Sequence, residues 1–452
     1  MAQTQASLGI DWGTHSSKWT WTVFESDSHG VTLGQFKILH SDVRLDSSNH
    51  KIFLSSDPPP SDSVYESSIK GKVIRDPDGS FWGGQRRQTK LTLGDLVSFS
   101  LWFLLGEAYE NLCANTGKEP DSVEFRFSLP NWVGIKDAAV ARASYEQAAR
   151  VACHIFVNDR QAWSRDPNPV REDWHANVQK ALEELKISDE FEINAETQDF
   201  ASLLQRIFTV AQGVTFRFVA ESSAAGLTGL RNVEADLEGH RYLRKILVVD
   251  VGAGSTDIGY VLRTIPPGHE GANEALIQLP PANTCHFAGE ELTRSIVEIY
   301  RSRGERITDL EAELRKTVRE DKDWLNHPAV DEWRRSIAEH VLSYVADIPD
   351  RRWLPENPAL QVLVTGGSSA VTGLGEKIVE AAKTGLERRG ISDEVIQGTS
   401  LMTLSLEGPP AADANRLAVA LGAASNDLPN LRYYPELDPP MPFATVRPLP
   451  PW

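Results

Sequence analysis

Two segments of the chain place one or two glycines after an apolar run and beside an aspartate. The first is Asp11-Trp12-Gly13-Thr14, and the second is Asp250-Val251-Gly252-Ala253-Gly254-Ser255. A tight turn with glycine lets backbone N–H groups approach a phosphate, because no Cβ stands in the way. The residues able to bind phosphate in this way are Gly13, Thr14 and His15 in the first turn and Gly252, Ala253, Gly254 and Ser255 in the second. The sequence therefore predicts two phosphate-binding turns.

Three carboxylates accompany these turns. Asp11 and Asp250 each end a predicted strand, and two carboxylates near a polyphosphate are most simply explained by Mg²⁺ held through its waters. Glu221, where a strand turns into a helix, can orient a nucleophilic water. Phosphoryl transfer needs mainly this kind of positioning and charge neutralisation. Each feature is common alone, but together with Gly366-Gly367-Ser368-Ser369 they form four strand-end features that indicate a nucleotide site.

Hydrophobic patterns predict the elements that carry these residues. In the first half we expect strands over Ser7–Ile10, Lys18–Phe24, Gln35–His40, Val123–Leu129 and Gly213–Ala220, and helices over Gly94–Asn115, Lys136–Cys153 and Ser222–Leu230. Asp76–Gly79 is expected to be a turn between two short strands. The segment 158–212 begins as a loop and continues with two charged helices, Asp173–Lys186 and Thr197–Ala211. We expect it to be an insertion that stands out from the core.

The second half repeats this order. We expect strands over Arg244–Val251, Ile258–Arg263 and Leu360–Thr365, and helices over Gly289–Arg303, Asp309–Leu325, Asn415–Ala424 and from Leu374. The repeat indicates an internal duplication, and hence an α/β fold of two lobes with a cleft between them. We expect one lobe over 1–238, with a small subdomain near 41–122 and the helical insertion near 158–212. The other covers 239–428, with a helical subdomain near 290–358, and a Pro-rich tail follows over 429–452.

Composition narrows the possible partners. The chain has 452 residues and a net charge of -17, which repels nucleic acid and anionic lipid surfaces. The apolar stretch Leu96–Leu105 is too short to cross a bilayer. Three widely spaced cysteines argue against a disulfide framework and favour a reducing, cytoplasmic location.

The motifs resemble the nucleotide-binding domain of the seventy-kilodalton heat-shock (DnaK-like) chaperones, within the actin-like ATPase superfamily. Gly9–Thr14 resembles the first phosphate motif, Ile246–Asp257 the second, Leu363–Ser369 the adenosine motif, Ala220–Ala225 and Ala418–Ala424 the two connecting motifs, and His286–Leu292 the helix start after the second hairpin. The similarity extends over Leu8–Ala424, with 158–212 as an extra segment.

The resemblance implies duplicated ribonuclease-H-like lobes around ATP or ADP and Mg²⁺. It assigns hydrated Mg²⁺ to Asp11 and Asp250, and the attacking water to Asp250 with Glu221 and Ser255. Implied phosphate ligands are Thr14 and Gly252–Ser255, with Gly289 and Glu290 near the ribose and phosphates and Gly366, Gly367 and Ser368 near the adenosine.

The chain departs from the family pattern at several positions. In the family, a lysine reaches the γ-phosphate. The nearest candidate for this lysine here is Lys90, with Arg86 or Arg87 as substitutes. In Leu314–Asn326, which resembles the helix that contacts the base, Lys322 fits, but Arg319 and Asp323 do not. Ala253 replaces a glycine, His15 a hydroxyl residue, and Ala370 the arginine that stacks on adenine.

These features predict a slow Mg²⁺-dependent ATPase whose lobe closure acts on an unidentified protein partner. About 25 residues follow the predicted ATPase, so the family's β-rich peptide-binding domain is not expected, and the chain resembles the family's ATPase-only relatives. Two alternatives stay open. One is a carbohydrate or other small-molecule kinase. Asp11–Lys18 resembles the start of such kinases, although no separate segment with a catalytic aspartate is found. The other is a polymerising or non-hydrolysing actin-like scaffold. The oligomeric state is left open.

Overall fold

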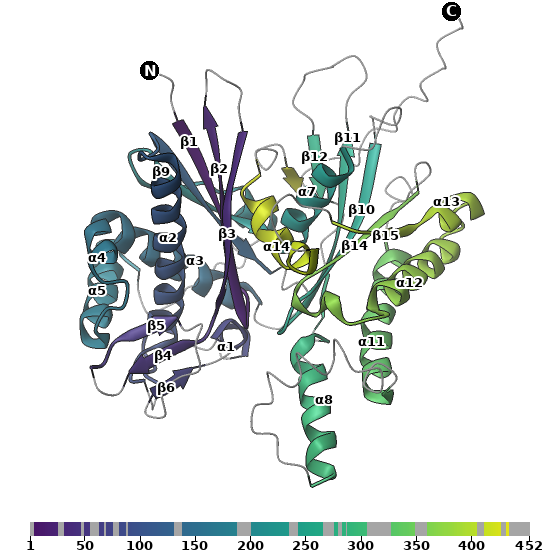
Figure 1. The fold of residues 1–452 in the computed structure, drawn as a ribbon, viewed down its shortest axis with the longest axis horizontal. Coiled ribbons are helices and arrows are strands. Elements are labelled where there is room, and N and C mark those ends of the chain that lie inside the picture. Colours follow the sequence, from purple (N-terminus) through teal and green to yellow (C-terminus); the bar gives the residue numbers. More distant parts are fainter. Residues whose placement is uncertain are drawn as a thin grey trace, which may run out of the picture. The chain divides into compact units, whose positions relative to one another are not determined.

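The strand-forming segments at the start of the chain build a mixed sheet in the computed structural model (Figure 1). The structure describes residues 4–25, 31–46, 49–54, 63–66, 69–75, 81–86, 89–130, 138–187, 200–234, 243–264, 275–278, 283–285, 287–304, 327–348, 359–404, 411–425 and 431–433. The chain divides into two compact units. Unit 1 consists of Met1–Thr228, Gly252–Gly254 and Arg416–Asn426, and unit 2 of Gly229–Val251, Ser255–Asn415 and Asp427–Trp452.

Unit 1 is built on a six-stranded sheet in the order β3-β2-β1-β7-β9-β8. Its strands are β1 (Thr4–Asp11), β2 (Ser16–Glu25), β3 (Val31–His40), β7 (Ser122–Leu129), β8 (Phe208–Ala211) and β9 (Val214–Ala220). β1 lies inside the sheet, antiparallel to β2 and parallel to β7. Seven of the eight β1 residues are buried, and the three that precede Asp11 are Leu8, Gly9 and Ile10. Asp11 therefore lies at the C-terminal end of a buried strand inside the sheet.

Helices cover this sheet, and a small second sheet accompanies it. The helices are α1 (Ile69–Arg75), α2 (Leu93–Thr116), α3 (Ala138–Asn158), α4 (Arg160–Arg165), α5 (Arg171–Glu184), α6 (Phe200–Gln205) and α7 (Glu221–Glu234). The small sheet contains β4 (Val43–Asp46), β5 (Ile52–Leu54) and β6 (Ser63–Glu66). α2 begins with a capping box, in which Thr92 and Asp95 each accept a hydrogen bond from the other's backbone N–H. Because α2 contacts α3, α5 and the sheet, it has buried side chains on most of its sides.

The described parts of the segment 158–212, residues 158–187 and 200–212, pack against other elements of unit 1, whereas the sequence analysis expected the insertion to stand out from the core. Trp174 on α5 is 1% exposed and donates to the backbone oxygen of Asp95 over 2.9 Å. Trp163 lies against α2, where a Cβ on Gly106 would approach its ring to 2.1 Å. The helix predicted over Thr197–Ala211 ends at Gln205, and the chain then enters β8, which pairs antiparallel with β9. Gly213, with φ of +74°, lies in the tight turn that joins β8 to β9.

Unit 2 contains a seven-stranded sheet in the order β15-β14-β10-β11-β12-β16, with β13 also paired to β11. The strands are β10 (Leu243–Val251), β11 (Thr256–Thr264), β12 (Ala275–Gln278), β13 (Asn283–Cys285), β14 (Gln361–Thr365), β15 (Ser400–Met402) and β16 (Leu431–Tyr433). β10 is antiparallel to β11 and parallel to β14. β16 pairs with β12, so the predicted tail contributes a strand to the sheet.

The two sheets share one strand order. In each sheet one central strand, β1 or β10, has an antiparallel neighbour on one side and a parallel neighbour on the other. The antiparallel neighbour, β2 or β11, pairs antiparallel in turn with β3 or β12. A further parallel strand follows on the parallel neighbour's side in both sheets. β1 in unit 1 and β10 in unit 2 therefore occupy equivalent places.

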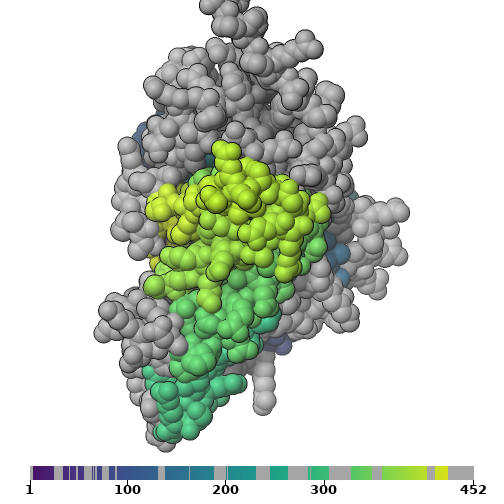
Figure 2. All heavy atoms as spheres, turned by 90° about the vertical axis from the view of Figure 1, so that its right-hand side faces the viewer, coloured from purple at the N-terminus to yellow at the C-terminus, as the bar shows by residue number. Residues whose placement is uncertain are grey.

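Helices of unit 2 lie along one face, shown from green to yellow-green in Figure 2. They are α8 (Gly289–Ser302), α11 (Pro328–Ala346), α12 (Leu374–Arg388) and α13 (Asp393–Gly398); the short 3₁₀ helix η3 (Gly367–Ala370) follows β14. Apolar residues of α11 and α12 pack against those of β10, β11 and β14 in one core cluster. The last helix, α14 (Ala411–Ala423), contributes residues to both units, as does α7. Among the described helices none is long and apolar enough to cross a bilayer.

Some predicted elements cannot be compared. The helix expected over Asp309–Leu325 and the turn at Asp76–Gly79 lie outside the described residues. The segment before that turn, expected to be a strand, is the helix α1. Its buried residues Ile69 and Val73 are four positions apart, which is the spacing of one helix face.

Candidate functional site

Asp11 ends β1 as a buried carboxylate that forms an ion pair across its own hairpin. The side chain of Lys18, the cross-strand partner of Asp11 on β2, donates to Asp11 Oδ2 over 2.8 Å. Between them, Gly13 leaves no room for a side chain, because a Cβ there would lie 2.2 Å from the backbone oxygen of Ser16 and 3.3 Å from Lys18 Nζ. The first predicted turn is therefore shaped by glycine and closed by a lysine.

A second buried ion pair joins Glu221 to Lys70. Glu221 is the first residue of α7, directly after β9, and Lys70 lies on α1; both side chains are 6% exposed. Lys70 Nζ is 2.5 Å from Glu221 Oε1. Helix α1 thus contributes the cation of this pair.

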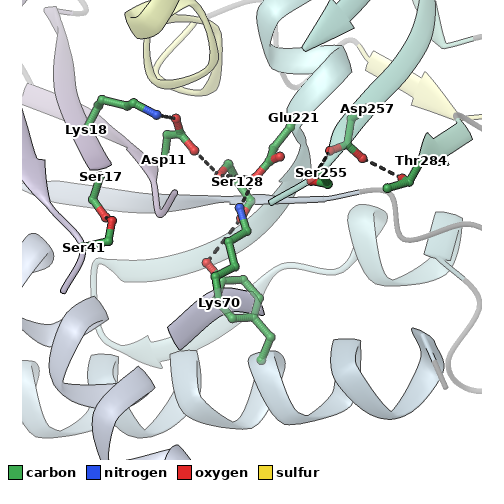
Figure 3. Close-up of polar contacts among 11 residues, drawn as sticks. Asp11, Ser17, Lys18, Ser41, Lys70, Ser128, Glu221, Ser255, Asp257 and Thr284 are labelled. Carbon is green, nitrogen blue, oxygen red and sulfur yellow. Dashed lines mark hydrogen bonds and ion pairs between the residues drawn. The ribbon is translucent and has the colours of Figure 1, made fainter. Parts of the chain in front are cut away.

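Ser128, on β7, connects the two ion pairs. Its hydroxyl lies 3.0 Å from Asp11 Oδ1 and 3.2 Å from Glu221 Oε1. Figure 3 shows Lys18, Asp11, Ser128, Glu221 and Lys70 as one continuous chain of contacts. Two carboxylates and two ammonium groups balance, which makes their burial physically possible. We call these five residues the unit 1 cluster.

Two aromatic rings pack behind the unit 1 cluster. Trp12 stacks on Tyr145 with ring centroids 5.3 Å apart and planes 8° apart. The Tyr145 hydroxyl donates to the backbone oxygen of Ser128 over 3.3 Å. Burial, with the negative charges of Glu221 and Asp11, holds the pKa of Tyr145 well above its ordinary value. Tyr145 therefore stays protonated and serves as a donor at neutral pH.

In unit 2, Asp250 is the second-last residue of β10 and lies beside the end of β14. Thr365, its register partner on β14, donates its hydroxyl to Asp250 Oδ1 over 3.0 Å. The next residue, Gly366, has φ of +87°, and a Cβ there would lie 2.6 Å from the same carboxylate oxygen. Only glycine suits this position, because both the backbone conformation and the space exclude a side chain.

A second carboxylate of unit 2, Asp257, lies across the hairpin from Asp250. Asp257 is 1% exposed and accepts hydrogen bonds from Ser255 over 3.0 Å and from Thr284 over 2.7 Å (Figure 3). The hydroxyl of Ser255, predicted to contact phosphate or water, is therefore directed at Asp257. The sequence analysis did not assign a role to Asp257 or Thr284.

Other predicted site residues take different places. Thr14 and His15 form the β1–β2 turn, Gly252, Ala253 and Gly254 the β10–β11 turn, Gly289 and Glu290 the first turn of α8, and Gly367 and Ser368 part of η3. Lys90 is exposed and has φ of +56°. The structure brings Lys70, not Lys90, to Glu221. Lys322 and Arg87 lie outside the described residues.

The carboxylates fit a hydrated divalent cation better than a directly coordinated one. Among the residues that the structure describes, no three His, Cys, Asp or Glu side chains gather to hold a metal. Both oxygens of Asp11 accept hydrogen bonds, from Lys18 and Ser128. Mg²⁺ commonly keeps several waters and takes one or two carboxylates with substrate phosphates, an arrangement that Asp250 suits.

No known protein-family model matches the chain, and no curated protein matches it significantly. The sheets and helices define the class of the protein: an α/β protein with two mixed sheets.

Proposed function

We propose that the chain binds Mg–ATP and hydrolyses it slowly, as a two-lobed actin-like ATPase of the heat-shock-chaperone type. The observation that carries the proposal is the repetition of one arrangement in both units. In each, a buried central strand carries an aspartate at its last or second-last residue, shortly before a glycine turn. This aspartate accepts a hydroxyl hydrogen bond from the neighbouring parallel strand. A duplicated site of this kind suits a ligand with several phosphates, such as ATP, bound by both turns.

The roles follow from charge and position. Asp250 and Asp11 are proposed to hold Mg²⁺ through its waters, and Mg²⁺ when bound supplies neutralisation of phosphate charge. Lys70 takes the role first sought at Lys90, because its buried ammonium group can exchange Glu221 for the γ-phosphate. Glu221, then released from Lys70, accepts a hydrogen bond from the attacking water. The turns at Gly13 and Gly252–Gly254 donate backbone N–H groups to the phosphates.

Nucleotide turnover is proposed to change the lobes' closure and so act on a protein partner in the cytoplasm. Hinge and shear movements around a bound nucleotide are a common way to couple hydrolysis to such partners.

Phosphate release from Mg–ATP tests the proposal. Wild-type protein should release phosphate slowly, and Asp250→Asn should abolish release while nucleotide binding measured by calorimetry is largely kept. Asp393→Asn, an exposed aspartate on α13, is the matched control and should behave as wild type. Wild-type turnover by Asp250→Asn would contradict the role given to this carboxylate. Phosphate transfer to a sugar panel would favour the kinase alternative, and ATP-dependent light scattering the polymer.

A further inference from the structure

The hydroxyl of Ser128 faces two carboxylates but has one hydrogen to give. Asp11 Oδ1 lies 3.0 Å away and Glu221 Oε1 3.2 Å away, so the two acceptors are almost equally placed. A serine hydroxyl is a single donor that rotates to suit its surroundings. When both carboxylates are ionised, Ser128 can serve one of them at a time.

The cations next to the carboxylates decide which acceptor is favoured. Lys18 binds the other oxygen of Asp11, Oδ2, whereas Lys70 binds the same Glu221 oxygen that Ser128 faces. While Lys70 stays on Glu221, Oε1 is already supplied with a donor. Loss of Lys70 to another anion removes the ammonium group from Oε1. The Ser128 hydrogen bond then matters more to Glu221, because a buried carboxylate is stabilised by each donor that it keeps.

The surroundings hold the Ser128 backbone while its hydroxyl can turn. Ser128 is fully buried on β7, between the paired strands β1 and β9. Tyr145, stacked on Trp12, donates to the Ser128 backbone oxygen. A change at Glu221 is therefore expected to move a hydrogen and leave the strand in place.

We propose that Ser128 is a positioning residue that couples the two carboxylates of the unit 1 cluster. The inference rests on the proposed function, in which Lys70 moves from Glu221 to the γ-phosphate. The Ser128 hydroxyl then turns from Asp11 to Glu221. Asp11 Oδ1, which loses this hydrogen bond, would then be an acceptor for the water of a hydrated Mg²⁺. Occupation of the γ-phosphate position is thereby transmitted to the metal-binding carboxylate.

Steady-state kinetics of three serine variants test this coupling. Ser128→Ala should lower kcat for Mg–ATP about tenfold, with KM and the Kd for Mg–ADP each within twofold of wild type. Ser128→Thr keeps the hydroxyl and should restore at least half of the wild-type kcat. Ser100→Ala is the control: it removes a buried hydroxyl that donates only within α2, to Leu96.

The outcomes separate this inference from the proposed function. An active wild type whose kcat is unchanged in Ser128→Ala overturns the coupling alone. The same holds if Ser128→Thr is as slow as Ser128→Ala, because the hydroxyl is then not what matters. If wild-type protein neither binds nor hydrolyses Mg–ATP, the proposed function fails, and the coupling fails with it.

Discussion

Thr365 donates its hydroxyl to Asp250 over 3.0 Å, at the end of two neighbouring parallel strands. Ser128 donates to Asp11 over the same distance, at the equivalent place in unit 1. The two strand-end aspartates are thus each held by a hydroxyl from the next parallel strand. This repeated geometry, rather than any one motif, is the observation on which the proposed function rests.

Loss of Lys70 should affect both stability and turnover. Lys70→Ala leaves the buried Glu221 carboxylate without its cation, and breaking a buried pair in this way costs about 3–5 kcal/mol. We expect a lower urea midpoint and an ATP turnover reduced at least a hundredfold. Lys90→Ala removes an exposed side chain and should change neither quantity. Equal effects of the two variants on turnover would contradict the assignment of Lys70.

Gly366 should not tolerate a side chain. Gly366→Ala places a Cβ 2.4 Å from the backbone oxygen of Val251 and 2.6 Å from Asp250 Oδ1, on a backbone with φ of +87°. We expect destabilisation of more than about 1 kcal/mol, measured by thermal or urea unfolding. For unfolding alone, Gly367→Ala is the comparison, since no atom lies within 4 Å of a Cβ there. A Gly366→Ala protein as stable as wild type would show that the turn is built differently.

The Glu124 carboxylate should make stability depend on pH. Burial raises its pKa, but Arg126 and Arg217 outweigh burial, so the pKa lies below its usual value. A carboxylate with a lowered folded-state pKa stabilises above its unfolded pKa of about 4.3, and this contribution is lost as pH falls through the folded value. The stability difference between wild type and Glu124→Gln should therefore be largest near neutral pH and shrink below about pH 4. A difference that stays constant from pH 7 to pH 3 would exclude this role.

An arginine at position 370 should strengthen base binding. Ala370 is exposed at the end of η3, where the chaperone resemblance implies an arginine stacked on adenine. Cation–π stacking at exposed sites is worth about 0.5–1 kcal/mol, so Ala370→Arg should tighten Mg–ADP binding roughly two- to fivefold. Calorimetry checks this, with inorganic triphosphate, which has no base, as the control ligand. A gain for triphosphate as large as that for ADP would indicate charge alone and not stacking.

Much of the fold could be predicted from local patterns. β1, β10 and β14 are buried and apolar, so their ends, and with them Asp11 and Asp250, were predicted within one or two residues. Lys70 was missed because Ile69-Lys70-Gly71-Lys72-Val73 alternates like a strand, although it forms the helix α1. Ser128 was missed for another reason: it is an ordinary strand residue, and only the pairing of β7 with β1 brings it to Asp11. Contacts between distant segments leave no local signal.

The most direct test of the central claim is a calorimetric titration of the wild-type protein with ATP, with and without Mg²⁺. The account predicts one nucleotide per chain, bound more tightly when Mg²⁺ is present, because the roles proposed for Asp11 and Asp250 need this ion. Absence of ATP binding at millimolar ATP, both with and without Mg²⁺, would contradict the account.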